Sequence, residues 1–450
     1  MNIVLIFADD LAYADVGCFG AKDIRTPHID SLARDGVRFT DFYVAQPVCS
    51  ASRAALLSGC YCGRVGIQGA LGPSSKIGIS SGELLLPQVL KAKGYATGMV
   101  GKWHLGHQPE FNPTRHGFDE WLGLPYSNDM WPNHPETPRA YPPLPLMDGE
   151  KQVQIIENLE QMGTLMQRYT DRAVGFIEKH ATKTPFFLYF AHAMPHVPLA
   201  PGKKWQGRSK RGAFGDVIEE LDASVGQLLA ALKRTGVECD TLVIFTSDNG
   251  PWLSYGEHAG SAGPLREGKG TCWDGGVREP FVARWPGRIR AGSVITEPAM
   301  TIDLLPTLAK LTGAPLPKNK IDGKDIWPLL SGDRAAKSPQ EAYFFYYNAN
   351  ELQAVRSGRW KVMLPQGYRT LGTNPPRATG GTPVKYKQAR IAQPLLYDLV
   401  ADLGETVDLA TQRPEVVKRL LGLAEKAREE LGDGPDRIGK GVRPVGRVGA

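Results

Sequence analysis

Polar side chains that can hold a hard cation follow two short apolar runs of the chain. Asp9 and Asp10 come directly after the first run, and Asp248 and Asn249 follow the second. Carboxylate and amide oxygens suit Ca²⁺ or Mg²⁺ better than Zn²⁺ or copper, and a cation would offset the repulsion between adjacent carboxylates. Each pair taken singly also fits an ordinary turn after a strand, but the repetition favours a metal site.

A cysteine near a predicted helix start is the candidate nucleophile. Cys49 lies at or just before a helix predicted over residues 51–58, where backbone N–H groups and the helix dipole favour negative charge. Arg53 is four residues further on and therefore lies over the same helix face. A lone cysteine is commonly a small buried apolar residue, whereas an arginine at this spacing favours an activated nucleophile.

Lysine and histidine side chains follow two further apolar runs. Lys102 and His104 come after one of them, and His192 and His196 come after the other. In open α/β sheets, sites form beyond the carboxyl ends of parallel strands, so these side chains and the acids can meet in one crevice if the strands are neighbours. Taken alone, Lys102 also fits a solvated strand end and His104 a packed histidine.

The elements that must position these residues predict an α/β fold. Short apolar runs alternate with helical patterns, which is typical of a largely parallel sheet between helices. The predicted strands lie at 3–7, 96–100, 186–190 and 242–246. The predicted helices lie at 29–35, 51–58, 85–93, 158–179, 217–234 and 302–311.

The composition changes in the last quarter of the chain. Beyond a polar stretch at 331–340, the pattern predicts short strands and one long helix, at 342–347, 352–357, 359–364 and 414–431. We therefore expect a catalytic domain of residues 1–335 and a C-terminal α+β domain of residues 336–450. We also expect the Pro-rich segment 132–148 to be an extended surface loop, and the tail from Gly432 to lie loosely on the surface.

Composition and charge exclude several classes of protein. Of 450 residues, 42% are hydrophobic and 22% are charged, which excludes a disordered or collagen-like chain. The 53 basic and 47 acidic residues give a net charge of +6, which allows an anionic substrate but does not indicate nucleic acid. The basic clusters Lys203-Lys204 and 208–211 fit solvated loops. Every apolar stretch is shorter than the ~18–20 residues of a membrane-spanning helix.

Neither the cysteines nor the N-terminal residues identify the cellular compartment of the protein. The six cysteines are scattered, unlike those of a disulfide scaffold. Residues 1–7 have no basic region or small-residue cleavage site, so they predict a strand and not a signal peptide. Either the protein is not exported or a leader has been removed before this sequence begins.

Motifs spread over almost the whole chain resemble those of the type I sulfatases, in the arylsulfatase A and N-acetylgalactosamine-6-sulfatase group. Residues 49–53, Cys-Ser-Ala-Ser-Arg, resemble the family signature Cys-x-Pro/Ala-x-Arg. Residues 94–97 with 101–106 resemble its second signature. Further similar segments follow in the same order, at 125–127, 247–250, 268–270, 275–280 and 396–399.

This resemblance implies a fold and a reaction. The fold would be alkaline-phosphatase-like, with a large, mainly parallel mixed sheet flanked by helices and a smaller C-terminal domain with a small antiparallel sheet. The reaction would be hydrolysis of a sulfate ester, of a carbohydrate or an aryl alcohol. In the family a maturation enzyme oxidises the motif cysteine, here Cys49, to formylglycine. One hydroxyl of the hydrated aldehyde attacks sulfur, and the other then expels sulfate and restores the aldehyde.

The resemblance also implies site residues. The ligands of a Ca²⁺ ion, or of Mg²⁺, would be Asp9, Asp10, Asp248, Asn249 and an oxygen at position 49. Arg53 would orient the aldehyde, Lys102 would bridge it and the substrate, and His104 would be the base for sulfate release. The sulfate and the leaving oxygen would contact His196 and Lys269. Substrate contacts would come from Ser127 with its neighbours Asn128 and Asp129. The rim candidates are Trp131, Trp252, His258 and Trp273.

Some of these inferences stay open at the level of sequence. Ala51 stands where proline is commoner in the signature, which affects how completely Cys49 is converted in a given host. His192 is expected to be structural, because the motif histidine is the one that precedes Val197. Two rival functions are a phosphonate or phosphate ester hydrolase of the same superfamily and a non-catalytic sulfoglycan-binding protein with unmodified Cys49.

Overall fold

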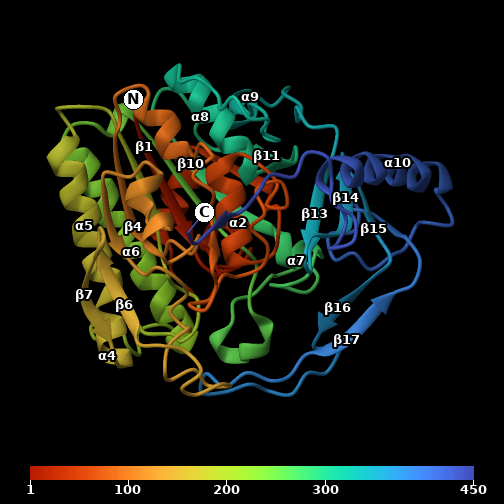
Figure 1. Cartoon of the computed structure of the whole chain (residues 1–450), viewed down its shortest axis with the longest axis horizontal. Coiled ribbons are helices and arrows are strands. Elements are labelled where there is room, and N and C mark those ends of the chain that lie inside the picture. The colour runs from red at the N-terminus through yellow and green to blue at the C-terminus, as the bar shows by residue number, and fades with distance from the viewer. Residues whose placement is uncertain (450) are drawn as a thin grey trace.

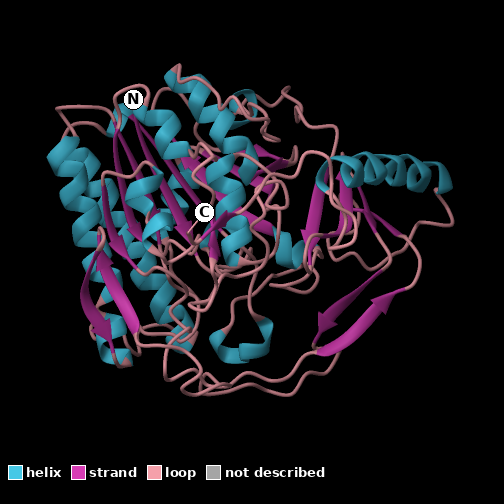
Figure 2. Ribbon diagram, in the orientation of Figure 1, coloured by secondary structure: helices cyan, strands magenta, loops and turns pink. Residues whose placement is uncertain are grey.

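The computed structural model describes residues 1–449, and its largest part is a mixed sheet flanked by helices (Figure 1, Figure 2). The four predicted strands run parallel at its centre, so the expectation that they are neighbours is confirmed. In spatial order they are β9 (Thr241–Ser247), β1 (Asn2–Ala8), β8 (Phe186–Ala191) and β4 (Ala96–Gly101). Within residues 1–449, no helix is both long and apolar enough to cross a membrane.

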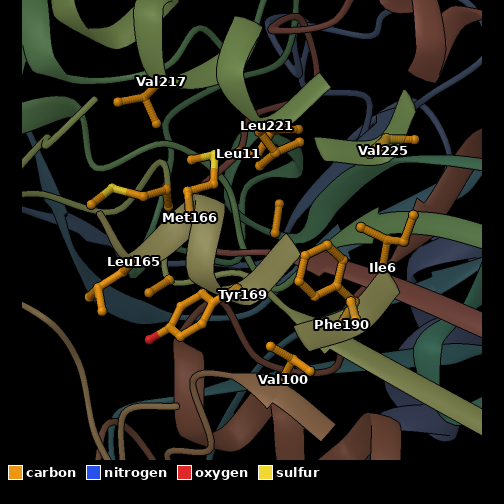
Figure 3. Packing of buried hydrophobic residues seen from close by; sticks show 14 of the residues in the cluster. Ile6, Leu11, Val100, Leu165, Met166, Tyr169, Phe190, Val217, Leu221 and Val225 are labelled. Atoms are coloured by element: carbon orange, nitrogen blue, oxygen red, sulfur yellow. The ribbon is translucent and has the colours of Figure 1, made fainter. Parts of the chain in front are cut away.

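Helices cover both faces of this sheet, which explains why its strands are continuous apolar runs. Alternate side chains of β1 point to opposite faces: Val4 and Ile6 pack in one hydrophobic cluster, and Leu5 and Phe7 in another. Figure 3 shows the first cluster, with Ile6 among side chains of the covering helices. Those helices are α1 (Pro27–Arg34), α5 (Leu165–His180) and α6 (Gly212–Arg234). The second face carries α2 (Cys49–Ser58), α3 (Leu86–Lys91) and α8 (Leu304–Thr312).

The sheet extends beyond the predicted strands on both sides. Next to β9, strand β10 (Arg278–Arg284) runs antiparallel both to β9 and to β2 (Val37–Tyr43). Two short strands, β11 (Ser293–Ile295) and β12 (Ala299–Met300), pair with β2. On the other side, β5 (Glu120–Gly123) runs parallel to β4. The sheet is therefore mixed but parallel at its centre.

Two expectations along this side of the molecule are wrong. The segment 132–148 ends in β6 (Leu144–Asp148), which pairs with β5 and forms an antiparallel hairpin with β7 (Lys151–Ile156). A sheet edge was available to pair with it, which a Pro-rich composition does not reveal. The single helix expected over 158–179 is divided into α4 (Leu159–Gly163) and α5, which meet at Thr164.

A separate, smaller antiparallel sheet forms the C-terminal domain, as expected. Its strand order is β13 (Tyr343–Tyr347), β14 (Glu351–Ser357), β15 (Trp360–Met363) and β18 (Leu395–Asp398). The long helix α10 (Pro414–Leu431) buries an apolar face that includes Leu420 and Leu423 in the same hydrophobic cluster as this sheet. Beside it lies a hairpin of β16 (Gln366–Thr370) and β17 (Lys387–Ile391), at the lower right of Figure 1.

The expectation that the tail from Gly432 lies loosely on the surface is wrong. Strand β19 (Gly446–Arg447) pairs with β3 (Ile77–Gly78) of the large domain. Arg443 donates from Nε and Nη2 to the carboxylate of Glu83, at 2.7 and 2.8 Å. Composition alone does not predict this return, because β3 and Glu83 lie more than 300 positions before the tail residues that contact them. The tail therefore fastens the end of the chain to the catalytic half.

We expect Arg443→Ala to lower the free energy of unfolding by about 1–3 kcal/mol, because it leaves the carboxylate of Glu83, whose side chain is only 6% exposed, without its partner. Urea denaturation followed by fluorescence measures this. The matched control is Arg447→Ala, an exposed arginine of the same tail, which should change the midpoint little. Equal midpoints for the two variants would contradict the proposed anchoring.

Candidate active site

The candidate metal ligands are brought together where β1 and β9 end. Asn249 donates from Nδ2 to Oδ1 of Asp10 at 2.7 Å, and the backbone amide of Asp10 donates to Oδ1 of Asp248 at 3.1 Å. Asp9, Asp248 and Asn249 are fully buried. One ligand atom from each of Asp9, Asp10, Cys49 and His196 lies within 4.8 Å of the others.

Helix α2 carries Cys49 and Arg53 to this cluster of acids. Arg53 is fully buried, and its Nη2 lies 2.8 Å from Oδ2 of Asp248 and 3.5 Å from Oδ2 of Asp9. Its Nη1 donates to the carbonyl of Lys102 at 3.1 Å. Arg53 therefore ties the ends of three strands together by neutralising two of their carboxylates.

The thiol of Cys49 is not an activated thiolate. Burial raises the pKa of Cys49 to about 12, even though Lys102 and Lys269 act to lower it. The expectation that Arg53 activates this thiol is therefore wrong, because the guanidinium of Arg53 forms ion pairs with Asp9 and Asp248 instead. At neutral pH the unmodified side chain stays protonated and is a weak nucleophile.

Two lysines place positive charge beside Cys49. Nζ of Lys102 lies 2.5 Å from Oδ2 of Asp9 and donates to Oγ of Ser127 at 3.1 Å. Nζ of Lys269 lies 2.6 Å from Oδ1 of Asp10 and 3.5 Å from Sγ of Cys49. Although burial opposes it, the carboxylate partners raise the pKa of both lysines, so both stay charged.

His104 is held as a neutral base that faces the site. Burial, together with the charges of Lys102 and Arg53, lowers the pKa of His104 well below 6.5. Its Nε2 lies 2.9 Å from the carbonyl oxygen of Leu71, a contact that fixes the proton on Nε2. Nδ1 is buried and has no hydrogen-bond partner among residues 1–449, so its lone pair is free to accept a proton.

In His196 the opposite ring nitrogen, Nδ1, hydrogen-bonds to a backbone carbonyl. Its Nδ1 lies 2.6 Å from the carbonyl oxygen of Val197, which places the proton there. Its Nε2 is 3.5 Å from Oγ of Ser127 and 3.6 Å from Oδ2 of Asp10. By contrast, His192 packs against the ring of Phe190, and burial lowers its pKa to about 3. Both observations agree with the expectation that His192 has a structural role.

A cavity of about 430 Å³ opens onto these groups. Of the predicted substrate and rim residues, Ser127, Asp129 and Trp252 line it, whereas Trp131 and His258 are not part of its lining. Asn128 instead lies behind the wall, where its Nδ2 donates to the carbonyl of His196 at 3.3 Å. Trp273, expected at the rim, is buried against Tyr368.

Sequence reasoning missed several residues of this cavity. One group belongs to the segment after Trp131, namely His134, Glu136, Thr137 and Tyr141. The polar residues of that Pro-rich segment were a signal that it carries function, but we assigned them to a surface loop. The other two, Tyr347 and Arg369, come from the C-terminal domain, and their positions in the chain give no sign that they meet Cys49.

The arrangement fits one tetrahedral anion next to one cation. Lys102 and Lys269 supply positive charge and hydrogen-bond donors at short distances from the carboxylate cluster. His104 supplies a neutral base in the same cavity. A sulfate or phosphate ester has the charge and size that these groups can bind, so the site is that of an ester hydrolase.

Comparison with known proteins agrees with this geometry. The family model Sulfatase matches residues 1–314, and the model for the C-terminal region of aryl-sulfatase matches residues 338–448. Arylsulfatase A of Homo sapiens is 42% identical over 99% of this chain and 91% of its own length. N-acetylgalactosamine-6-sulfatase of Mus musculus is 37% identical over 92% of this chain and 83% of its own length.

Solved structures show the same fold. The crystal structure of the PsFucS1 sulfatase from Pseudoalteromonas sp. has a TM-score of 0.83 and 28% identity, and covers 95% of this chain and 90% of that one. The structure of Ps i-CgsB in complex with k-i-k-neocarrahexaose has a TM-score of 0.80 and 29% identity, and covers 98% and 95%. Fold and site thus define a hydrolase of the alkaline-phosphatase-like class. More particularly, this chain belongs to the sulfatase family and is a sulfuric ester hydrolase.

We expect Arg53→Ala to lower the free energy of unfolding by about 3–5 kcal/mol, because it removes the ion-pair partner of buried Asp248 and one of the two cations beside buried Asp9. Arg53→Lys keeps the charge and should lose less. Urea unfolding of the two variants, beside the exposed control Arg115→Ala, measures the difference. An Arg53→Ala protein as stable as the control would refute this account of the buried charges.

Proposed function

We propose that this enzyme hydrolyses a carbohydrate sulfate through a formylglycine formed from Cys49, with Ca²⁺ or Mg²⁺ bound beside it. The observation that carries this proposal is the buried, protonated thiol of Cys49, which lies 3.5 Å from the charged amine of Lys269 and within reach of the carboxylate cluster. Such a thiol is a poor nucleophile. A hydrated aldehyde at this position would supply one hydroxyl whose oxygen bonds to sulfur while the bond between sulfur and the alcohol oxygen breaks and the alcohol leaves. Deprotonation of the second hydroxyl would then expel sulfate and restore the aldehyde.

The residues around Asp9 fit a hard divalent cation. Oδ1 of Asp9, Oδ2 of Asp10 and Oδ1 of Asn249 are buried, and none has a hydrogen-bond partner in the described part of the chain. Unpartnered buried oxygens are costly, and an oxygen-binding cation relieves that cost. We infer that Asp9, Asp10, Asp248 and Asn249 would hold the ion, whose chemistry there is to withdraw charge from sulfate oxygens.

The positions of the remaining polar residues suggest a separate role for each of them in the proposed reaction. Lys102 and Lys269 stabilise charge on the transferring group, since both lie beside position 49 and stay protonated. His104 accepts the proton that triggers sulfate release, because its Nδ1 is free and unprotonated. Nε2 of His196, the atom nearest Ser127, faces the same place, and with a proton bound there it would donate to the sulfate or to the leaving oxygen.

A sugar is the substrate that the cavity supports best. Its outer wall is polar, with Asp129, His134 and Glu136 in positions to hydrogen-bond hydroxyl groups, and Trp252 offers an aromatic face. Relatives point the same way, since one is named for N-acetylgalactosamine-6-sulfate and one structural neighbour holds a neocarrahexaose. The cavity of about 430 Å³ is within the range of sites that enclose a small ligand.

Co-expression with a formylglycine-generating enzyme should lower the mass of the Cys49 peptide by about 18 Da and produce sulfatase activity. Peptide mass spectrometry gives the converted fraction, which matters because Ala51 replaces the commoner proline. Cys49→Ala should lose more than about a thousandfold in kcat/KM on an aryl sulfate and on sulfated sugars, because it removes the nucleophile.

Activity and binding assays of the same co-expressed protein distinguish the proposed function from its two rivals. A clear preference for a phosphate diester or phosphonate over a sulfate monoester would favour the phosphoester hydrolase. Tight binding of sulfated sugars without turnover, by a protein whose Cys49 is fully converted, would favour the binding protein. Either result would overturn the proposal.

Added Ca²⁺ or Mg²⁺ should raise the melting temperature, because the ion binds the folded state only. Asp10→Asn and Asn249→Ala should weaken this shift, while Asp240→Asn, an exposed control at the start of β9, should keep it. A thermal shift titration of chelator-treated protein measures the effect without requiring conversion of Cys49. No shift with either ion at millimolar concentration would contradict the metal site.

A further inference from the structure

A long arm of the C-terminal domain reaches the active site. This arm, residues 366–391, consists of β16, β17 and the segment between them, which runs along the lower edge of Figure 1 toward the large domain. The backbone amide of Val384 donates to the carbonyl of Ser254 at 2.8 Å, and the amide of Ser254 donates to the hydroxyl of Tyr386 at 3.2 Å. The amide of Gly380 donates to Oε1 of Glu257 at 2.8 Å. The arm is thus fastened to the loop that follows Trp252.

Arg369 is the residue of the arm that comes closest to the chemistry. Its Nε donates to the carbonyl oxygen of Lys269 at 3.0 Å, and its Nη2 donates to the same oxygen. The guanidinium lies 4.6 Å from the ring centroid of Tyr386, which supports it from the arm itself. Arg369 also lines the active-site cavity.

The peptide between Lys269 and Gly270 is held from two sides. The large domain holds it through the backbone amide of Gly270, which donates to the carbonyl of Pro47 at 2.9 Å. It also holds the preceding peptide, whose amide on Lys269 donates to the carbonyl of Pro251 at 3.0 Å. On the other side of this peptide lies Arg369 of the arm. A Cβ atom at position 270 would lie 2.4 Å from Cζ of Arg369, which is too close. Gly270 has φ +77°, a conformation that favours glycine. The close contact of the guanidinium with this peptide therefore depends on a glycine.

Next to the contact between Arg369 and Lys269, the neighbouring residue of β16 also hydrogen-bonds to the same loop. Oγ1 of Thr370 donates to Oε1 of Glu267 at 2.6 Å. Consecutive residues of β16, Arg369 and Thr370, thus bind the loop that carries Lys269 at two points, Lys269 and Glu267. A lysine side chain is long and flexible, so the placement of its amine depends strongly on where its backbone is fixed.

We propose that Arg369 is a positioning residue for sulfate ester hydrolysis, which holds Lys269 so that its amine stays between Asp10 and position 49. This inference rests on the proposed function of Lys269. A main-chain shift of about 1 Å at such a group can cost about a hundredfold in rate. The C-terminal domain therefore contributes to the reaction and does not merely cover the catalytic domain.

Removal of the guanidinium tests this directly. In the converted enzyme, Arg369→Ala should lower kcat on an aryl sulfate by about 10- to 100-fold with little change in KM, because ground-state binding does not depend on the misplaced amine alone. Millimolar guanidinium chloride should restore part of kcat, and Arg369→Lys should lie between the two. Arg390→Ala, an exposed arginine of β17, is the matched control and should keep full activity.

A second measurement does not depend on activity. Hydrogen–deuterium exchange of the peptide covering residues 266–270 should rise in Arg369→Ala and stay unchanged in Arg390→Ala, with or without conversion of Cys49. Unchanged exchange would overturn the proposal, as would a raised KM with unaltered kcat, which would mean that Arg369 only binds substrate. If the converted wild type has no sulfatase activity, the proposed function fails, while the exchange experiment still decides whether Arg369 holds this loop.

Discussion

The structure depends on keeping three carboxylates buried at the ends of two neighbouring strands. Asp9, Asp10 and Asp248 would repel one another and disrupt the sheet if they were left alone in a low-dielectric interior. Three cationic side chains, Arg53, Lys102 and Lys269, lie against them. They come from a helix, a strand end and a distant loop. The need to balance buried charge therefore acts together with hydrophobic packing to fix the relative placement of these segments.

The same charge balance prepares the site for its reaction. Cationic groups that neutralise carboxylates in the folded protein are also the groups that face an incoming anion, so little reorganisation is required when the ester binds. The two histidines differ in which ring nitrogen is free, since a backbone carbonyl accepts from Nε2 of His104 but from Nδ1 of His196. Identical side chains thus present different ring nitrogens, each with a free lone pair, to one cavity.

Much of the fold and of the site could be predicted from the sequence, for physical reasons that apply to particular residues. The central strands are buried on both faces, so runs such as Ile3 to Phe7 are apolar throughout and easy to recognise. Polar residues after such strands gather at one sheet edge, which is why the pair at Asp9 and the pair at Asp248 could be placed together. The antiparallel strands β2 and β10 escaped prediction because their polar residues, such as Arg38 and Arg278, interrupt the apolar pattern.

The rest of the site depends on long-range placement. Tyr347 and Arg369 belong to a different domain, and no local periodicity relates them to Cys49. The failure to predict an inert thiol has a similar origin. Helical spacing correctly placed Arg53 near Cys49, but only the structure shows that acids from two other segments take up its charge.

The strand order also governs when the molecule can assemble. β1 is synthesised first, yet it pairs with β8 and β9, which contain Phe187 and Thr241. The centre of the sheet therefore stays unmade until about 200 further residues have followed Cys49 from the ribosome, an interval of roughly 10–40 s at 5–20 residues per second. Until then α2 lacks the complete sheet against which it packs in the folded protein, where Cys49 is 2% exposed. If position 49 is converted to formylglycine as proposed, the strand order leaves the thiol accessible to the maturation enzyme during this interval.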